Sequence, residues 1–161
     1  MRGFLLFFSG LIAGAFVMQY GLAQAPGERM ALNHVGIAVK NFDEAVDFYT
    51  KTMGFKQAFV FREPDGKPIM TYLQINRDTF LEIQPVQADR PAGFTHFGLE
   101  LGDIKATTSR LQQRGVKAPD PTVSQRTGAL LTNGTDREGV RFELLQFGPA
   151  SAQRKAMNSW K

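Results

Sequence analysis

The first stretch of alternating apolar and small or polar residues runs over Asn33–Val39 and predicts a β-strand. Apolar residues then recur at helical spacing. Asn41 and Glu44 have the spacing of a capping box, and Gly54 is a suitable helix stop. Three further strands are predicted after that helix, at Lys56–Glu63, Ile69–Asn76 and Phe80–Pro85. The first half of the chain therefore has the order strand, helix and three strands.

The same pattern occurs a second time. His34–Asn41 aligns with His96–Asp103, and Phe80–Ile83 aligns with Arg141–Leu144. The second copy predicts a helix capped by Asp103 and ended by Gly115, followed by strands at Thr122–Arg126, Ala129–Gly134 and Val140–Phe147. Such an internal repeat indicates two copies of one supersecondary unit.

The repeat predicts an α+β domain over residues 30–148, built from two βαβββ modules at 32–86 and 94–147. A short segment with Pro91, Gln87–Gly93, links the modules. The C-terminal tail, 149–161, contains a predicted helix over Ser151–Lys161, with Met157 and Trp160 as residues that could dock it.

The N-terminal segment 1–25 has the pattern of an export signal. Arg2 provides a positive start, and an almost unbroken apolar run follows from Phe4 to Met18. The small residues near its end favour cleavage after Ala23. The alternative is an uncleaved anchor, but the run is short compared with the ~20 residues of a membrane span. We therefore expect a periplasmic or secreted protein with no stable membrane association after cleavage.

Composition limits the chemistry available to the domain. The chain has no cysteine and two histidines, so a disulfide scaffold, a thiol nucleophile and a cysteine-ligated metal are excluded. A metal site would need histidine, aspartate or glutamate ligands. Although the net charge is +4, the basic residues are scattered rather than gathered in a stripe. This distribution argues against a nucleic-acid-binding surface.

The two histidines occupy equivalent positions in the two copies, as do two glutamates. His34 and His96 lie on the strand face opposite the helix, and each is followed two residues later by a glycine. Glu82 and Glu143 stand between apolar neighbours in matching strands. Two neutral imidazoles and two carboxylates form a charge-balanced set for one divalent ion. Zinc, nickel, manganese and iron all remain open, as does whether one chain or two supply the ligands.

The chain resembles the vicinal oxygen chelate superfamily, the group of glyoxalase I, methylmalonyl-CoA epimerase, extradiol dioxygenases and bleomycin-resistance proteins. The motifs that carry the resemblance are His34-Val-Gly-Ile-Ala-Val, Phe80-Leu-Glu-Ile, His96-Phe-Gly-Leu-Glu and Arg141-Phe-Glu-Leu. The resemblance implies a curved eight-stranded mixed sheet around a metal cleft, usually in a homodimer. It also implies that His34, Glu82, His96 and Glu143 are the ligands, and that a small-molecule substrate chelates the metal through adjacent oxygens.

Departures from individual members narrow the expected activity. The full His-Glu-His-Glu set is similar to that of glyoxalase I, but Ala38 and Val86 stand where that enzyme has residues for glutathione. Methylmalonyl-CoA epimerase typically has glutamine at the position of Glu82, and extradiol dioxygenases leave it without a ligand. The pattern therefore favours a glyoxalase-like lyase or isomerase whose substrate is not a glutathione adduct.

In that reaction, by resemblance, one carboxylate loosens from the metal and moves a proton between neighbouring carbons, with Glu143 as the first candidate base and Glu82 as the second. Strand parity makes Tyr72 and Gln74 candidate substrate-binding residues, and Asn133 is a third candidate as the repeat partner of Tyr72.

Two other functions remain open. One is a non-catalytic protein that sequesters an apolar or chelating compound in a cleft lined by Phe59 and Phe61. The other is a ring-cleaving enzyme similar to the dioxygenases.

Overall fold

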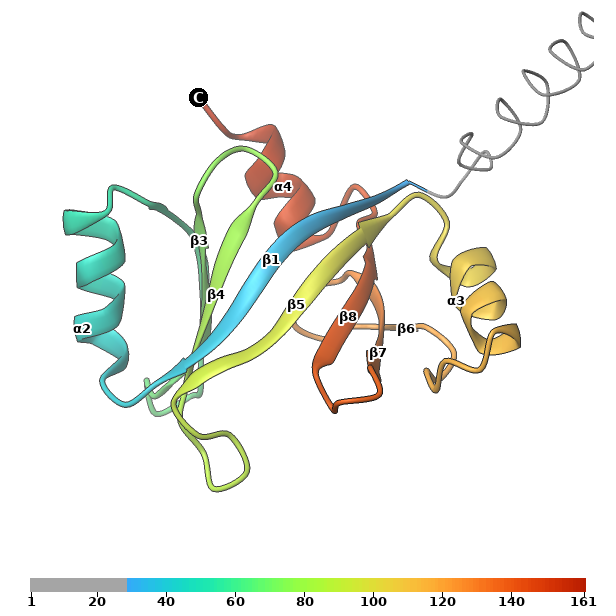
Figure 1. Ribbon diagram of the computed structural model, residues 1–161. Helices are drawn as coiled ribbons and strands as arrows, with labels where there is room; N and C mark the ends of the chain where they lie inside the picture. The colour runs from blue at the N-terminus through green and yellow to red at the C-terminus, as the bar shows by residue number, and fades with distance from the viewer. Residues whose placement is uncertain (1–28) are drawn as a thin grey trace, which may run out of the picture.

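The computed structural model describes residues 29–161 and consists of two similar halves (Figure 1). The first half contains strand β1 (Met30–Val39), helix α2 (Phe42–Asp47) continued by the π-helical turn η1 (Phe48–Thr52), and strands β2 (Lys56–Arg62), β3 (Pro68–Gln74) and β4 (Phe80–Pro85). The second contains β5 (Gly93–Leu101), α3 (Ile104–Gln113), β6 (Thr122–Val123), β7 (Leu130–Thr135) and β8 (Arg141–Gln146). The predicted α+β fold with paired βαβββ modules is confirmed.

All eight strands form one mixed sheet, in the order β2-β3-β4-β1-β5-β8-β7-β6. Within each module the first strand pairs in parallel with the last, β1 with β4 and β5 with β8. The two modules join through the antiparallel pair β1 and β5, which lie at the centre of the sheet (Figure 1). The four central strands of the sheet are therefore the first and last strands of each module, in the order β4-β1-β5-β8.

The two faces of the sheet have different coverings. On the outer face, α2 packs over Leu81 and Ile83 of β4, and α3 packs over Leu144 of β8. On the inner face lie Tyr72, Phe80, Leu145 and Phe147, which pack against the C-terminal helix α4 (Ala152–Asn158). The sequence neighbours of Glu82 and Glu143 point into the outer core. Since side chains alternate along a strand, the two glutamates themselves lie on the inner face.

The C-terminal helix docks as expected but is shorter than predicted. Ser151 caps α4 by accepting a hydrogen bond from the Arg154 amide, and Met157 is fully buried. The Ala152 amide also donates to the Thr127 carbonyl at 2.8 Å, which ties the start of α4 to the loop before β7. Trp160 is partly buried, with the ammonium of Lys56 over its ring.

Two local predictions differ from the structure. Asn41 precedes α2, but its side chain makes no capping hydrogen bond and instead donates to the Glu44 carboxylate at 2.8 Å. The predicted strand Thr122–Arg126 ends at Val123, because Ser124 begins a turn in which its carbonyl accepts from the Gly128 amide. By contrast, the Asp103 cap of α3 is confirmed by its hydrogen bond from Ala106.

The predicted leader over 1–25 lies outside the described residues. Among residues 29–161, no helix has the length and apolar character needed to cross a membrane. The predicted homodimer concerns a second chain and stays a prediction.

Candidate metal centre

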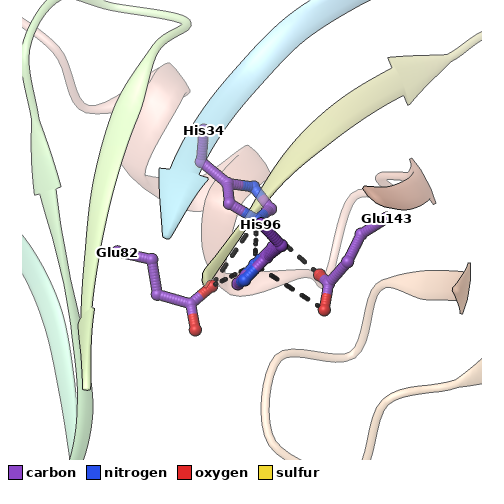
Figure 2. Close-up of side chains that lie close together, drawn as sticks. All are labelled: His34, Glu82, His96 and Glu143. Atoms are coloured by element: carbon purple, nitrogen blue, oxygen red, sulfur yellow. Dashed lines mark hydrogen bonds and ion pairs between the residues drawn. The ribbon is translucent and has the colours of Figure 1, made fainter. Parts of the chain in front are cut away.

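The four predicted ligands come from the four central strands, and their side chains converge on one point (Figure 2). His34 lies on β1, Glu82 on β4, His96 on β5 and Glu143 on β8. One candidate ligand atom from each residue lies within 4.8 Å of the other three. A single chain can therefore supply the complete set.

The distances within the cluster are those of groups that can share one ion. The Nε2 atoms of His34 and His96 are 3.0 Å apart. The carboxylate of Glu82 lies 3.5 and 3.4 Å from these two nitrogens, and that of Glu143 lies 3.7 Å from each. Ligands bound at about 2.0–2.2 Å to a common ion are separated by roughly 3–4 Å. The spacing thus fits one central cation.

The glycine after each histidine makes room for the other histidine. His34 pairs with Gly98 across β1 and β5, and Gly36 pairs with His96. A Cβ atom added to Gly98 would overlap the His34 ring, and one added to Gly36 would overlap the His96 ring. The sequence indicated that these glycines allow something to approach, and the structure identifies it as the imidazole of the opposite module.

We expect that Gly98→Ala lowers metal affinity by displacing the His34 ring. A loss of about 10–100-fold is the usual scale when the support of a metal ligand is disturbed. Competition titration with a chromogenic chelator measures this change. Gly148→Ala is the matched control because its added methyl group would meet no atom within 4 Å. Equal metal affinities in the two variants would contradict the reciprocal packing.

Hydrogen bonds orient both imidazoles. His34 Nδ1 lies 3.1 Å from Asn33 Oδ1, while the Asn33 amide nitrogen donates to the Asp78 carbonyl. Because an amide oxygen can only accept, Nδ1 of His34 carries the proton and Nε2 presents a lone pair to the cluster. His96 Nδ1 lies 2.9 Å from the Thr95 hydroxyl, so its Nε2 also faces inward. Such outer contacts are typical of metal-binding histidines.

His34 is suited to remain neutral as a ligand. It is completely buried. Burial lowers its pKa to about 4, against the opposing effect of Glu82 and with the help of His96 and Arg141. When both Nε2 atoms present lone pairs, their approach to 3.0 Å is favourable only if both bind a common cation. This arrangement is a direct physical argument for a metal ion.

Glu82 is the more constrained carboxylate. The Tyr72 hydroxyl donates to its Oε2 at 2.5 Å, and the Gln84 amide donates to its Oε1. Burial would raise the pKa of Glu82, but its contacts with His96, His34 and Tyr72 outweigh this effect and lower the pKa to about 2. Burial, with the two glutamates, raises the pKa of Tyr72 well above its usual range, so this hydroxyl keeps its proton.

Glu143 has a different environment. Arg141 is the side-chain hydrogen-bond donor to its Oε1, at 2.8 Å, and also donates to Asn133 Oδ1 at 3.0 Å. Burial raises the pKa of Glu143, with Glu82 adding to this and His96 and Arg141 opposing it. Its side chain is 12% exposed, against 3% for Glu82. The two equivalent carboxylates of the repeat are therefore not equivalent in freedom or basicity.

The donor set and its surroundings fit one divalent metal ion. Imidazole nitrogens with carboxylate oxygens suit zinc, nickel, manganese or iron, and the two carboxylates would balance the charge of the ion. The predicted grouping of His34, Glu82, His96 and Glu143 is confirmed as a cluster, while the identity of the metal stays open.

A cavity of about 270 Å³ adjoins the cluster on the inner face of the sheet. Tyr72 and Asn133 line it, and each lies opposite one of the glutamates in the strand register. Gln74 does not line it, because its buried amide donates to the Arg77 carbonyl in the β3–β4 turn. Phe59 stacks on Tyr72 within the core rather than lining the cavity. Substrate contact by Tyr72, Gln74 and Asn133 stays a prediction.

Sequence reasoning missed several lining residues of this cavity. Strand parity would have found Gln84 and Arg141, which lie two residues from the predicted glutamates on the same face. Arg90 and Arg126 come from connecting segments, and Gln153 comes from α4. No pattern in the chain indicates that these three residues approach the cluster.

Comparison with known proteins places this site in a family. The model of the Glyoxalase/Bleomycin resistance protein/Dioxygenase superfamily matches residues 31–144. The chain belongs to this superfamily. The match contains the first module, the second module up to residue 144, and all four residues of the metal cluster. The resemblance read from the strand motifs is thereby confirmed.

Among the curated members of this superfamily, two lactoylglutathione lyases of Arabidopsis thaliana are similar to the chain. A probable chloroplastic enzyme is 27% identical over 151 residues, which are 88% of this chain and 43% of the plant protein. A second lactoylglutathione lyase is 25% identical over 126 residues, 72% of this chain and 44% of that protein. The chain thus spans less than half the length of these relatives.

Several solved structures share the fold. Methylmalonyl-CoA epimerase from Mycobacterium tuberculosis has a TM-score of 0.65 at 19% identity, covering 80% of this chain and 94% of the epimerase. A hypothetical protein from Bacillus halodurans has a TM-score of 0.62 at 21% identity, covering 75% of this chain and 96% of that protein. At such identities the likeness concerns the arrangement of the chain and leaves the reaction open.

Proposed function

We propose that this member of the superfamily is a metal-dependent lyase or isomerase. Its substrate would be a small carbonyl or α-hydroxycarbonyl compound, and its reaction a proton transfer through an enediolate. The observation that carries the proposal is the complete four-ligand cluster, whose two carboxylates line the adjoining cavity and of which Glu143 is the more exposed, at 12% against 3% for Glu82.

A divalent ion held by His34, Glu82, His96 and Glu143 would polarise a substrate carbonyl and lower the free energy of the oxyanion that forms on deprotonation. The protein residues divide the remaining work. Glu143 takes a proton from the carbon beside the carbonyl and returns it to the neighbouring carbon. Arg141 orients that carboxylate through its hydrogen bond. Tyr72 and Gln84 hold Glu82 in place as a ligand.

The surroundings of two residues support a substrate other than a glutathione adduct. Ala38, where glyoxalase I carries a basic residue for glutathione, is buried at 2% exposure and offers no charge. Val86 stands where that enzyme carries an asparagine, and its apolar side chain lines a neighbouring cavity. The similarity to the plant lactoylglutathione lyases therefore supports a lyase-type reaction more than a glutathione adduct as the substrate.

Deuterium exchange tests the proposed reaction. The metal-loaded protein is incubated in D₂O with hydroxyacetone, dihydroxyacetone or methylglyoxal, and NMR follows the loss of the proton on the carbon beside the carbonyl. The hemithioacetal of methylglyoxal and glutathione is assayed in parallel. We expect metal-dependent exchange with a glutathione-free compound, because Glu143 and the metal act together on an α-proton.

Tight binding of carbonyl compounds without any exchange would favour the sequestering function instead. Turnover of the glutathione hemithioacetal alone would contradict the proposed substrate class while leaving the reaction class intact. Metal-free protein is the control for buffer-catalysed exchange.

We also propose that the protein acts outside the cytoplasm, on the basis of its N-terminal segment. Cleavage after Ala23 would leave a mature chain that begins at Gln24. Intact-mass spectrometry of protein recovered from its native compartment should give the mass of that shorter chain. A mass that corresponds to a start at Met1 would contradict the proposal.

A further inference from the structure

We infer that the substrate carries a carboxylate or phosphate group beyond its metal-chelating oxygens, and that Arg90 and Arg126 bind this anionic group. The inference rests on the proposed function, because it assigns a second binding point to the molecule that chelates the metal. It is carried by the charges that line the site cavity and by the absence of a carboxylate partner, among the described residues, for two of its arginines.

The lining of the cavity carries an excess of positive charge. Its ionisable cations are the guanidinium groups of Arg90, Arg126 and Arg141, and its carboxylates are Glu82 and Glu143. A divalent ion would balance both carboxylates, so the three guanidinium groups would give the occupied cavity a net positive charge. An enediolate with a second anionic group would supply the missing negative charge.

Two of the three arginines are available to a ligand. Arg141 already donates to Glu143 and Asn133. Arg90 has one long contact, with the Pro85 carbonyl at 3.4 Å, and Arg126 has no hydrogen bond or ion pair with any described residue. A guanidinium group stays charged at every relevant pH and matches carboxylate or phosphate oxygens in a two-pronged contact.

The position of these arginines places the anionic group at the outer end of the site. Both also line a second cavity of about 420 Å³, which shares Met70 and Gln84 with the metal cavity. Arg90 belongs to the segment between the modules, and Arg126 to the turn between β6 and β7. Lys67 and Glu63 also line the second cavity, and their opposite charges cancel. The two arginines therefore give this cavity its net positive charge. A group between them would lie at the boundary of the two cavities.

Hydroxamates with and without a second charge test this inference on the zinc-loaded protein. A hydroxamate chelates a metal through two adjacent oxygens, as an enediolate does. Acetohydroxamate is the neutral probe, succinate monohydroxamate adds a carboxylate, and phosphonoacetohydroxamate adds a phosphonate. Calorimetry measures each Kd at fixed ionic strength. We expect at least one charged probe to bind about tenfold or more tightly than acetohydroxamate, and the tighter of the two indicates the natural group.

Arginine variants identify the residues responsible. Arg126→Gln and Arg90→Gln should remove most of the advantage of the charged probe and leave the Kd of acetohydroxamate unchanged. Arg114→Gln is the matched control, since it removes the same charge from the exposed end of α3. Its affinities should equal those of the parent.

The outcomes separate this inference from the proposed function. If acetohydroxamate binds but charge brings no advantage, or if the advantage survives in the Arg90→Gln/Arg126→Gln double variant, the anion site is wrong and the chelating site stands. If a charged probe binds through the arginines while acetohydroxamate does not bind, the anion site is supported and chelation is contradicted. If no probe binds, both fail.

A second, independent observation concerns Gln153 of α4, which we propose as a substrate-binding residue. Its side chain is completely buried and lines the metal cavity beside the Tyr72 hydroxyl. Neither its amide nitrogen nor its amide oxygen makes a hydrogen bond of ordinary length and angle with a described residue, because the neighbouring Tyr72 hydroxyl donates to Glu82. Gln153 also lies beyond residues 31–144, the part of the chain that the superfamily model matches.

The chemistry of the amide matches the proposed substrate. A buried amide without partners destabilises the folded protein, so its retention at a cavity wall is explained when a ligand completes its hydrogen bonds. An α-hydroxycarbonyl compound offers an oxygen that accepts and a hydroxyl that donates. Gln153 can donate to the first and accept from the second.

The variant Gln153→Leu tests this role, since leucine has a similar volume and no polar atom. We expect the Tm to stay equal or rise, because an unsatisfied amide is removed, while the Kd for acetohydroxamate rises about tenfold. Gln113→Leu, on the exposed surface of α3, should leave that Kd unchanged. A Gln153→Leu protein that binds acetohydroxamate as the parent does would overturn the role, whatever its Tm.

Discussion

Replacement of Glu143 by glutamine is expected to lower any metal-dependent proton exchange by about a hundredfold or more. This is the usual scale for the loss of a general base. Glutamine keeps the size of the side chain and one ligand oxygen but removes the basic charge, so metal content should fall only modestly. Deuterium exchange at equal metal occupancy measures the effect, with bound metal determined in the same samples.

The Glu82→Gln variant is the matched comparison, because it changes the equivalent carboxylate of the other module. Glu82 is fixed by Tyr72 and Gln84, so its replacement should affect metal affinity more and proton transfer less. A larger catalytic loss in Glu82→Gln would reverse the assignment of the base. Parent-like activity in both variants at equal metal content would contradict carboxylate catalysis.

Removal of either histidine is expected to abolish the stabilisation that metal binding gives. A ligand present at 100 times its Kd stabilises a folded protein by about 2.7 kcal/mol, which corresponds to a rise in Tm of roughly 10 °C for a domain of this size. His34→Ala and His96→Ala should lose this rise because the two carboxylates then face each other with one imidazole. Thermal unfolding with and without added metal measures the difference.

Chelator-treated parent protein is the reference for these variants. Its Tm should lie below that of the metal-loaded parent and should recover when the metal is returned, which shows that the rise depends on the ion. A histidine variant that gains as much Tm from the metal as the parent would show that its imidazole is not a ligand.

The repeat made much of the architecture predictable. Since the two copies share the order of strands and helix, the position of His34 in one predicts that of His96 in the other. Strand parity then placed both histidines and both glutamates on the face opposite the helix of each module. The cluster depends on these local alternations, and for that reason sequence reasoning reached all four residues.

Contacts between modules could not be predicted in the same way. The pairing of His34 with Gly98 depends on the register of β1 against β5, which no local pattern determines. The turn that carries Arg126 and the helix that carries Gln153 reach the cavity through tertiary packing, including the bond from the Ala152 amide to the Thr127 carbonyl. Gln74 is the opposite case. Strand parity predicted it near the site, but its side-chain amide donates to the Arg77 carbonyl in the β3–β4 turn.

Sequence differences between the two modules give the two glutamates different surroundings. Tyr72 and Gln84 surround Glu82, whereas Asn133 and Leu145 occupy the equivalent positions around Glu143. Arg141 likewise stands where the first module has Phe80, which is buried in the core. With these three differences, Glu82 is held by two neutral donors and Glu143 is the more exposed of the two carboxylates.

Metal content per chain tests the central claim most directly. The protein is produced without an affinity tag, purified without chelators, and measured by elemental analysis and native mass spectrometry. The arrangement of His34, Glu82, His96 and Glu143 within one chain predicts one divalent ion per chain in the parent and none in His34→Ala or His96→Ala. Parent protein that retains no zinc, nickel, manganese or iron after incubation with each ion, or histidine variants that retain one ion per chain, would contradict it.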